Sequence, residues 1–161
     1  HAPRRLGRWV SMTRSRRKAR EAVLQALYWA ESSGDPVEQT LHTVSLRADL
    51  APEAARFATA VGTQAWERRE ELDRLIGSAS ENWALERISR IDRILLRMAL
   101  TEILAFEDVP PKVSIDEAIE LAKRYSSENA PAFVNGILDA LVKREDVLAG
   151  GAGQLEPSAG T

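Results

Sequence analysis

The sequence predicts an all-α protein of seven helices. Apolar residues recur with helical spacing along most of the 161 residues, whereas the alternating pattern of half-buried strands is nearly absent. Prolines and capping residues stand where helices should begin. A hydrophobic fraction of 44% and a charged fraction of 29% are typical of a soluble globular domain that buries a core.

The first two predicted helices are separated by a short turn. Residues 14–31 form the first helix and place a row of small apolar side chains on one face: Ala19, Ala22, Val23, Ala26, Leu27 and Ala30. Asp35 is a candidate N-cap, followed by Pro36 at the first helical position, and Glu38 completes a capping box. These residues predict a short second helix that ends near Ser45.

The middle of the chain predicts three further helices. The third and longest covers residues 52–76, where Gly77 is placed to stop it. A short fourth helix is expected over 82–88, capped by Asn82. The fifth, over 91–104, is apolar on most sides, so we expect it to be central and buried.

The last two helices complete the predicted core. Ser114 and Glu117 form a second capping box that starts a helix ending near Tyr125. Residues 133–142 carry the apolar stripe of a final core helix. Gly136 lies inside this helix, and we expect it to permit close helix packing.

Charge is distributed unevenly along the chain, although the net charge is only −2. Residues 1–20 hold eight arginines and lysines and no acid, whereas residues 21–161 hold 14 basic and 24 acidic side chains. This asymmetry predicts a basic element that meets a polyanion and an acidic body that does not.

The chain is expected to have three parts. Residues 1–11 are interpreted as a disordered or vector-derived extension, with Met12 as the natural start. Residues 12–148 form the folded domain, and the glycine-rich segment 149–161 is a disordered tail. The basic element does not depend on the extension, because five of the nine residues 12–20 are basic: Arg14, Arg16, Arg17, Lys18 and Arg20.

Catalysis, metal binding and membrane insertion find little support in the sequence. Cysteine is absent, and the only histidines are His1 and His42, so no zinc-binding pair is available. Neither a phosphate-binding glycine loop nor a dinucleotide fingerprint occurs. No apolar run approaches the roughly 18 residues that span a bilayer, and the first residues show no apolar stretch that would predict secretion. We expect a cytoplasmic protein without cofactor, metal or enzymatic activity.

The first helix is the best candidate for a binding site. On a helix, Arg16 and Arg17 each lie about one turn from Arg20, and the three are expected to share a surface that continues through Gln25 to Tyr28. Guanidinium groups bind phosphates bidentately, and a base can stack on a tyrosine, so the pattern favours single-stranded RNA. The basic run at residues 14–20 is equally consistent with an N-terminus that is solvated and binds no partner. Membrane-surface binding fits less well, because the apolar face is small and alanine-rich.

Three stretches resemble the NusB family of bacterial transcription antitermination factors. They are RRKAREAVLQALY (16–28), NWALERISRIDRILLRMALTEI (82–103) and DVPPKVSIDEAIELAKRYSSENAPAFVNGILD (108–139). The similarity covers nearly all of residues 12–145, and the combination of KVSIDEAIELAK with FVNG is specific. The resemblance implies a bundle of two small helical subdomains that binds RNA.

The resemblance also implies partners. Members of this family bind the boxA element of nascent ribosomal RNA together with NusE, a protein of the small ribosomal subunit, within the antitermination complex of RNA polymerase. Family RNA contacts fall on Arg16, Arg17, Arg20, Gln25, Tyr28, Lys112, Asn129 and Phe133, and the basic run adds Arg14 and Lys18. The NusE surface would include Glu86, Asp92 and Arg93.

Several alternatives stay open at this point. Spacing alone favours Phe133 as a core residue, allows either role for Tyr28, and explains Asp92 equally well by an ion pair with Arg90 or Arg93. The chain is otherwise a helical interaction protein with a non-specific nucleic-acid-binding arm, or the RNA-binding domain of a ribosomal RNA methyltransferase. The sequence also leaves open whether the chain forms a homodimer, for which Trp83 is a candidate contact.

Two consequences follow for RNA binding. Asn129 stands where an aspartate is frequent in the family, and the loss of a negative charge beside phosphates should weaken repulsion. Neutralising Arg16, Arg17 and Arg20 together should abolish RNA binding and leave the fold untouched.

Overall fold

The computed structural model describes residues 2–80, 84–144 and 147, with side chains from Arg14 onward. Throughout these residues the regular secondary structure is helical and includes no strand, which confirms the all-α prediction. The chain divides into two compact units, His1–Thr63 and Gln64–Thr161, as expected for two small subdomains. No helix in the described part combines the length and the apolar character that a membrane crossing requires. The predicted tail, 149–161, lies outside the described residues.

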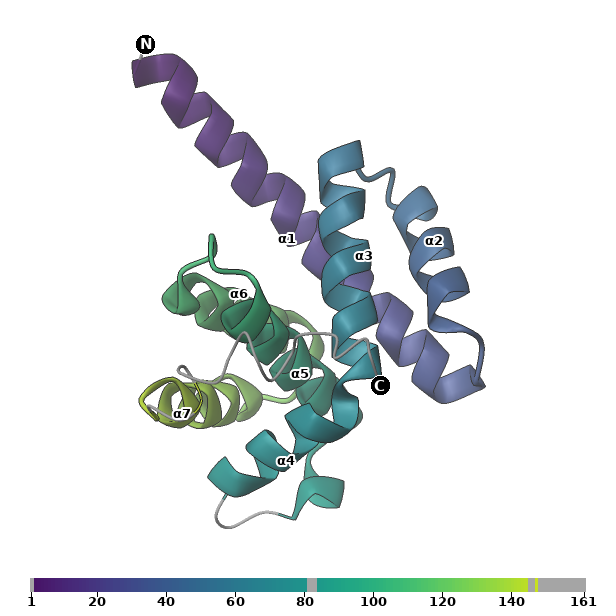
Figure 1. Cartoon of the computed structure of the whole chain (residues 1–161), viewed down its shortest axis with the longest axis vertical. Coiled ribbons are helices and arrows are strands. Elements are labelled where there is room, and N and C mark those ends of the chain that lie inside the picture. The colour runs from purple at the N-terminus through teal and green to yellow at the C-terminus, as the bar shows by residue number, and fades with distance from the viewer. Residues whose placement is uncertain (1, 81–83, 145–146, 148–161) are drawn as a thin grey trace, which may run out of the picture. The chain divides into compact units, whose positions relative to one another are not determined.

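The first unit contains α1 (Ala2–Ser33), α2 (Val37–Arg47) and most of α3 (Pro52–Glu67) (Figure 1). α1 reaches back to Ala2, well before the predicted start near residue 14. α2 packs antiparallel on the C-terminal half of α1 (Figure 1). The predicted apolar face of α1 is confirmed, since every member is buried: Ala19, Ala22, Val23, Ala26, Leu27 and Ala30.

The turn between α1 and α2 differs from the predicted capping box. Gly34 adopts a positive φ of 81°, which glycine accepts without steric cost, and its N–H donates to the Ala30 carbonyl. Asp35 does not cap α2, because its Oδ2 accepts a hydrogen bond of 2.9 Å from Trp29 Nε1. Pro36 is the cap residue of α2 and forms no side-chain capping bond.

The second unit contains α4 (Arg69–Ala79), the 3-10 helix η1 (Leu85–Arg87), α5 (Arg90–Ala105), α6 (Pro111–Tyr125) and α7 (Ala130–Val142). α5 packs against α4, α6 and α7 and is buried along most of its length, which confirms its predicted central place.

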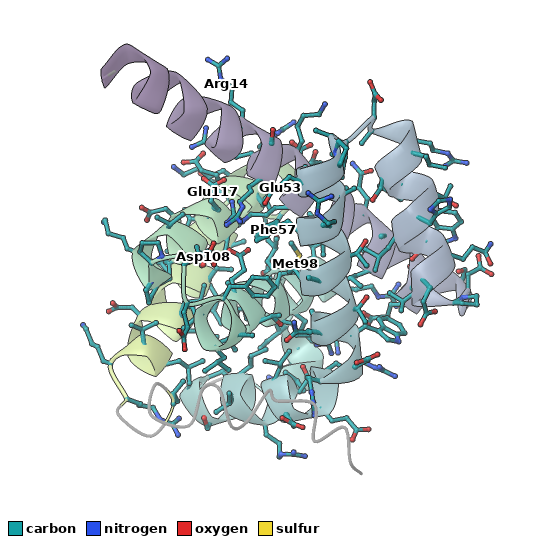
Figure 2. All side chains as sticks on the ribbon, turned by 45° about the horizontal axis from the view of Figure 1, so that its top comes forward. Arg14, Glu53, Phe57, Met98, Asp108 and Glu117 are labelled. Carbon is teal, nitrogen blue, oxygen red and sulfur yellow. The ribbon has the colours of Figure 1, made fainter. Side chains whose placement is uncertain are left out.

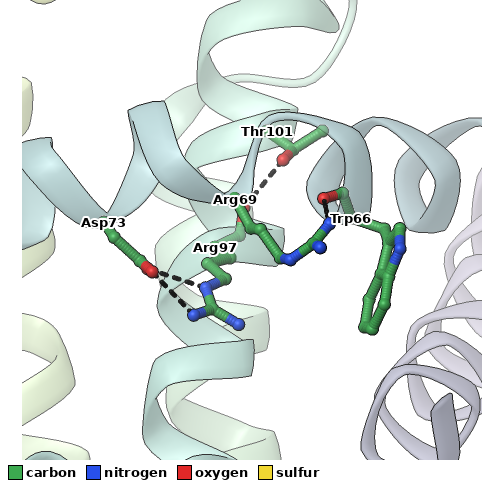
Figure 3. Close-up of polar contacts among 5 residues, drawn as sticks. All are labelled: Trp66, Arg69, Asp73, Arg97 and Thr101. Atoms are coloured by element: carbon green, nitrogen blue, oxygen red, sulfur yellow. Dashed lines mark hydrogen bonds and ion pairs between the residues drawn. The ribbon is translucent and has the colours of Figure 1, made fainter. Parts of the chain in front are cut away.

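Two predicted helices of the middle region have different bounds in the structure. The single helix expected over 52–76 is two helices, α3 and α4. They are separate because Arg69 Nη1 donates a hydrogen bond of 2.6 Å to the Trp66 carbonyl (Figure 3). In an unbroken helix that carbonyl would accept from a backbone N–H four residues later. Gly77 does not end α4, which continues to Ala79. The helix expected over 82–88 is reduced to η1, while Asn82 and Trp83 lie outside the described residues.

Two further predictions for the second unit are wrong. Ser114 does not cap α6, which begins at Pro111; its hydroxyl donates instead to Glu102 Oε1 on α5 at 3.0 Å. Gly136 makes no close helix contact, since a Cβ added there would meet nothing within 4 Å. The close approach occurs in the first unit, where a Cβ on Gly62 would come within 2.6 Å of Leu41 Cδ2.

A partly buried ion pair joins α4 to α5 (Figure 3). Asp73 accepts two hydrogen bonds from Arg97, one from Nε at 2.7 Å and one from Nη2 at 2.8 Å. Thr101 donates to the Arg97 carbonyl one turn along α5. This planar, bidentate pairing satisfies a charge inside the unit and fixes the spacing of the two helices.

Candidate nucleic-acid interface

The exposed side chains of α1 form a stripe along one side of the helix. Arg14, Lys18, Gln25 and Tyr28 are exposed and follow one another at intervals that keep them on the same side, and Figure 2 shows Arg14 projecting from the helix. Tyr28 is 42% exposed, so it faces solvent and not the core. We call these residues, together with the neighbouring exposed Arg17, the α1 stripe.

Arg16 and Arg20 lie on a different side of α1 from the stripe. Their guanidinium carbons stand 4.3 Å and 5.1 Å from the centre of the Phe57 ring on α3. Arg16 Nη2 also lies 3.3 Å from Glu53 Oε1, one turn before Phe57. Arg20 is 4% exposed. The expectation that the first-helix arginines share one surface is therefore wrong, because two of them pack on α3.

This packing has an energetic reason. The face of an aromatic ring attracts a guanidinium, and the carboxylate of Glu53 reduces the repulsion between two neighbouring cations. Arg16 and Arg20 thus help to hold α1 against α3. Their replacement should disturb the first unit as well as any RNA contact, contrary to the expectation that the fold would be untouched.

Three predicted RNA contacts belong to the second unit. Lys112 stands in the first turn of α6, with its side chain 88% exposed and its Nζ 4.0 Å from Asp116 Oδ2. Asn129 is the exposed N-cap residue of α7, and Phe133 lies one turn further on and is half-buried. The structure thus gives Phe133 an intermediate position between core and solvent.

Asn129 and Phe133 line a common hollow of about 290 Å³. Its wall also includes Arg87, Ser89, Asp92 and Ser127, with Ile88 and Ala130. The hollow therefore combines an aromatic ring, an amide, hydroxyl groups and a guanidinium. A ring provides a stacking surface for a base, and an amide offers both a donor and an acceptor to a base edge. We call this feature the α7 hollow.

The three residues expected to contact NusE differ in exposure. Glu86 is exposed on η1, and Arg93 is half-buried on α5. Asp92 is only 7% exposed, and its Oδ1 accepts a hydrogen bond of 2.7 Å from Ser126 Oγ. Asp92 is therefore not an open surface charge, because its carboxylate is hydrogen-bonded to the α6–α7 turn.

Comparison with known proteins identifies the family. The family model described as the NusB family matches residues 17–143. The chain is 48% identical over 129 residues to the transcription antitermination protein NusB of Salinibacter ruber, covering 80% of this chain and 81% of that protein. The chain belongs to the NusB family.

Solved structures agree with this assignment. NusB of T. maritima is similar to this chain with a TM-score of 0.74 and 38% identity, over 88% of this chain and 96% of that one. A structure of the antitermination factors NusB and NusE in complex with dsRNA shares the fold, with a TM-score of 0.72 at 23% identity over 85% and 98% of the two chains. The predicted resemblance to NusB is confirmed.

Some neighbours of the NusB-like site were missed from the sequence. Phe57 and Glu53 lie in the middle of the chain, and nothing in their spacing identifies them as partners of Arg16. Ser126 and Ser127 were not singled out from the sequence, although a double serine separated from Asn129 only by Glu128 was an available signal. Arg87 joins the α7 hollow from η1, which the periodicity misread as a longer helix.

Proposed function

We propose that this chain is a transcription antitermination factor that binds the boxA element of nascent ribosomal RNA together with NusE. The RNA contacts are the α1 stripe, Lys112 and the α7 hollow, with Arg16 and Arg20 reinforcing the positive potential of α1. The partner surface includes Glu86 and Arg93. The protein acts in the cytoplasm within the antitermination complex of RNA polymerase, as a binding protein without catalysis.

The α1 stripe is the observation that carries this proposal. It places exposed cations on the same side of a helix as an exposed amide and a 42% exposed tyrosine. Phosphates can pair with Arg14, Arg17 and Lys18 while a base stacks on Tyr28. An exposed aromatic ring has no role in a merely soluble basic terminus, and it supports contact with unpaired bases.

The α7 hollow favours a sequence-specific factor over a helical protein with a non-specific basic arm. A purely electrostatic arm needs cations alone, whereas the hollow adds a ring and an amide. The methyltransferase alternative has less support, because the relatives that this chain matches over about four fifths of their length carry the name of an antitermination protein.

A competition experiment tests the proposal. Purified protein is titrated into a boxA oligomer and a scrambled oligomer of the same composition, alone and with NusE. We expect boxA to bind more tightly and NusE to increase the preference. If about four phosphates are neutralised, the logarithm of the affinity should fall with a slope near −3 against the logarithm of the salt concentration. Equal affinities for the two oligomers in both conditions would leave only the non-specific arm.

A further inference from the structure

A hydrogen bond between distant parts of the second unit joins two of the elements that line the α7 hollow. Asp92, in the first turn of α5, accepts from Ser126 Oγ at 2.7 Å across 34 residues of sequence. The backbone N–H of Asp92 itself donates to Ser89 Oγ, the N-cap of α5, at 3.1 Å. Ser89 and Asp92 line the hollow from the start of α5, while Ser127 and Asn129 line it from the α6–α7 turn.

Ser126 stands at the point where the direction of the chain changes. It follows α6 directly, has an extended backbone (φ −119°, ψ −171°), and its N–H donates to the Ala122 carbonyl. The turn after it is closed by the N–H of Ala130, which donates to the Ser127 carbonyl at 3.0 Å. Asn129 lies inside this turn. The position of Ser126 therefore influences the position of the amide that faces the hollow.

The hydrogen bond between Ser126 and Asp92 is chemically suited to hold the α6–α7 turn in place. A hydroxyl that donates to a carboxylate forms a short, charge-assisted bond that is stronger than a neutral one. A carboxylate that is 7% exposed is costly unless it is hydrogen-bonded, and the N-terminus of α5 adds favourable partial charge. A turn held in one conformation also loses less entropy when a ligand binds to it.

We infer that Asp92 is a positioning residue for RNA, which acts through Ser126 to hold Asn129 and Phe133 in the geometry that receives a base. This inference rests on the proposed function and deepens it. It assigns to Asp92 a role different from the direct NusE contact that the resemblance implies. It also assigns a role in RNA binding to Ser126. This residue acts indirectly, because it holds the turn that carries Asn129.

Single and double variants test this inference. Ser126→Ala removes the donor and leaves the carboxylate, and Asp92→Ala removes the acceptor. We expect each to lower the affinity for boxA RNA by about tenfold, the scale of one charge-assisted hydrogen bond. The double variant should bind no more weakly than the weaker single variant, because both remove the same bond. Asp92→Asn keeps an acceptor oxygen and should retain most of the affinity.

A second cycle separates positioning from general stability. In a Phe133→Ala background, Ser126→Ala should cost less RNA affinity than in the original chain, since the ring that it positions is gone. Ser78→Ala is the matched control, because it removes a serine hydroxyl on α4 that accepts from Arg144 Nη1 away from the hollow, and it should leave the boxA affinity unchanged. Thermal melting monitored by circular dichroism verifies that each variant is folded, and binding to NusE without RNA should be unchanged by Ser126→Ala.

Three results would overturn the inference while the proposed function stands. They are full boxA affinity in Ser126→Ala, a loss in Asp92→Ala that affects only NusE binding, and equal costs of Ser126→Ala with and without Phe133. If the original chain shows no preference for boxA over the scrambled oligomer, the proposed function fails first and the inference falls with it.

Discussion

The α1 stripe in the first unit and the α7 hollow in the second offer a nucleic acid different kinds of contact. The stripe presents cations on one rigid helix, with an amide and a ring further along. The hollow presents an amide from the α6–α7 turn and a ring from α7, and the turn is tied to α5 by a side-chain hydrogen bond. Exposed cations attract any polyanion and lose strength with salt, whereas a shaped hollow can discriminate bases. We expect affinity to depend mainly on the first unit and sequence preference mainly on the second.

The ion pairs of the two units differ in how deeply they are buried. The loss of the more buried pair is the largest effect we expect, and it concerns stability. The side chains of Arg97 and Asp73 are 8% and 20% exposed, whereas those of Arg16 and Glu53 are 17% and 48% exposed. Asp73→Ala leaves a buried guanidinium without its carboxylate and should lower the free energy of unfolding by about 3 kcal/mol. Glu53→Ala should cost less than about 1 kcal/mol.

Urea denaturation of both variants measures this difference. If Glu53→Ala destabilises the protein as much as Asp73→Ala, the cluster around Phe57 is a more important part of the first unit than its exposure indicates.

The next largest effect concerns the exposed cations of α1. Replacing Arg14, Arg17 and Lys18 by alanine should lower the affinity for single-stranded RNA by about a hundredfold at low salt and reduce the salt slope by about 2. The reason is that three phosphate contacts are lost while the packing of α1 on α3 is untouched. Filter binding or fluorescence anisotropy over a range of salt concentrations measures both quantities.

The matched control for this triple variant is the pair Arg16→Ala and Arg20→Ala, which removes fewer charges. Because these residues pack on Phe57, the pair should also lower the melting temperature, which the triple variant should not. An unchanged salt slope in the triple variant would show that the stripe does not contact phosphates.

Two glycines give a third comparison between the units. Gly62→Ala would place a methyl group within 2.6 Å of the buried Leu41 and should destabilise the protein by about 1–3 kcal/mol. Gly136→Ala meets nothing within 4 Å on the exposed side of α7 and should stabilise it by about 0.5–1 kcal/mol, because alanine favours the helix. Thermal and urea denaturation of both variants test the pair. Destabilisation by Gly136→Ala would indicate an additional packing role for this glycine.

Local signals predicted the helices well and their ends less well. The buried face of α1 followed from periodicity alone, since each apolar position of that face is buried. The caps failed where a side chain found a stronger distant partner: Asp35 accepts from Trp29, and Ser114 donates to Glu102. A capping box is a local preference, and a tertiary hydrogen bond overrides it.

In the candidate site, too, local signals predicted some features, whereas tertiary contacts determine the others. Residue type singled out the cations of the α1 stripe, whereas spacing alone allowed either role for Tyr28, which the structure exposes. The inward direction of Arg16 and Arg20 depends on Phe57, which is far away in sequence and carries no local signal. The α7 hollow could not be predicted from spacing, because η1, α5 and the α6–α7 turn meet only in the folded unit.

The smallest effect we expect concerns the RNA affinity of a variant in the α7 hollow of the second unit. Asn129 is the N-cap residue of α7 but forms no side-chain capping bond, so Asn129→Asp should leave stability unchanged or raise it slightly. The added negative charge would lie at the hollow, near the proposed path of the phosphates. Repulsion through water at this range should lower boxA affinity only about threefold.

Anisotropy titrations of Asn129→Asp and of the neutral control Asn129→Ser separate charge from the loss of the amide. The cost of the aspartate should shrink at high salt, since screening weakens repulsion between exposed charges, whereas the cost of the serine should not. An Asn129→Asp variant that binds boxA more tightly than the original chain would contradict the placement of phosphates beside the hollow. A cost that is independent of salt would instead assign the effect to lost contacts with a base, because a hydrogen bond to a base edge is not screened in this way.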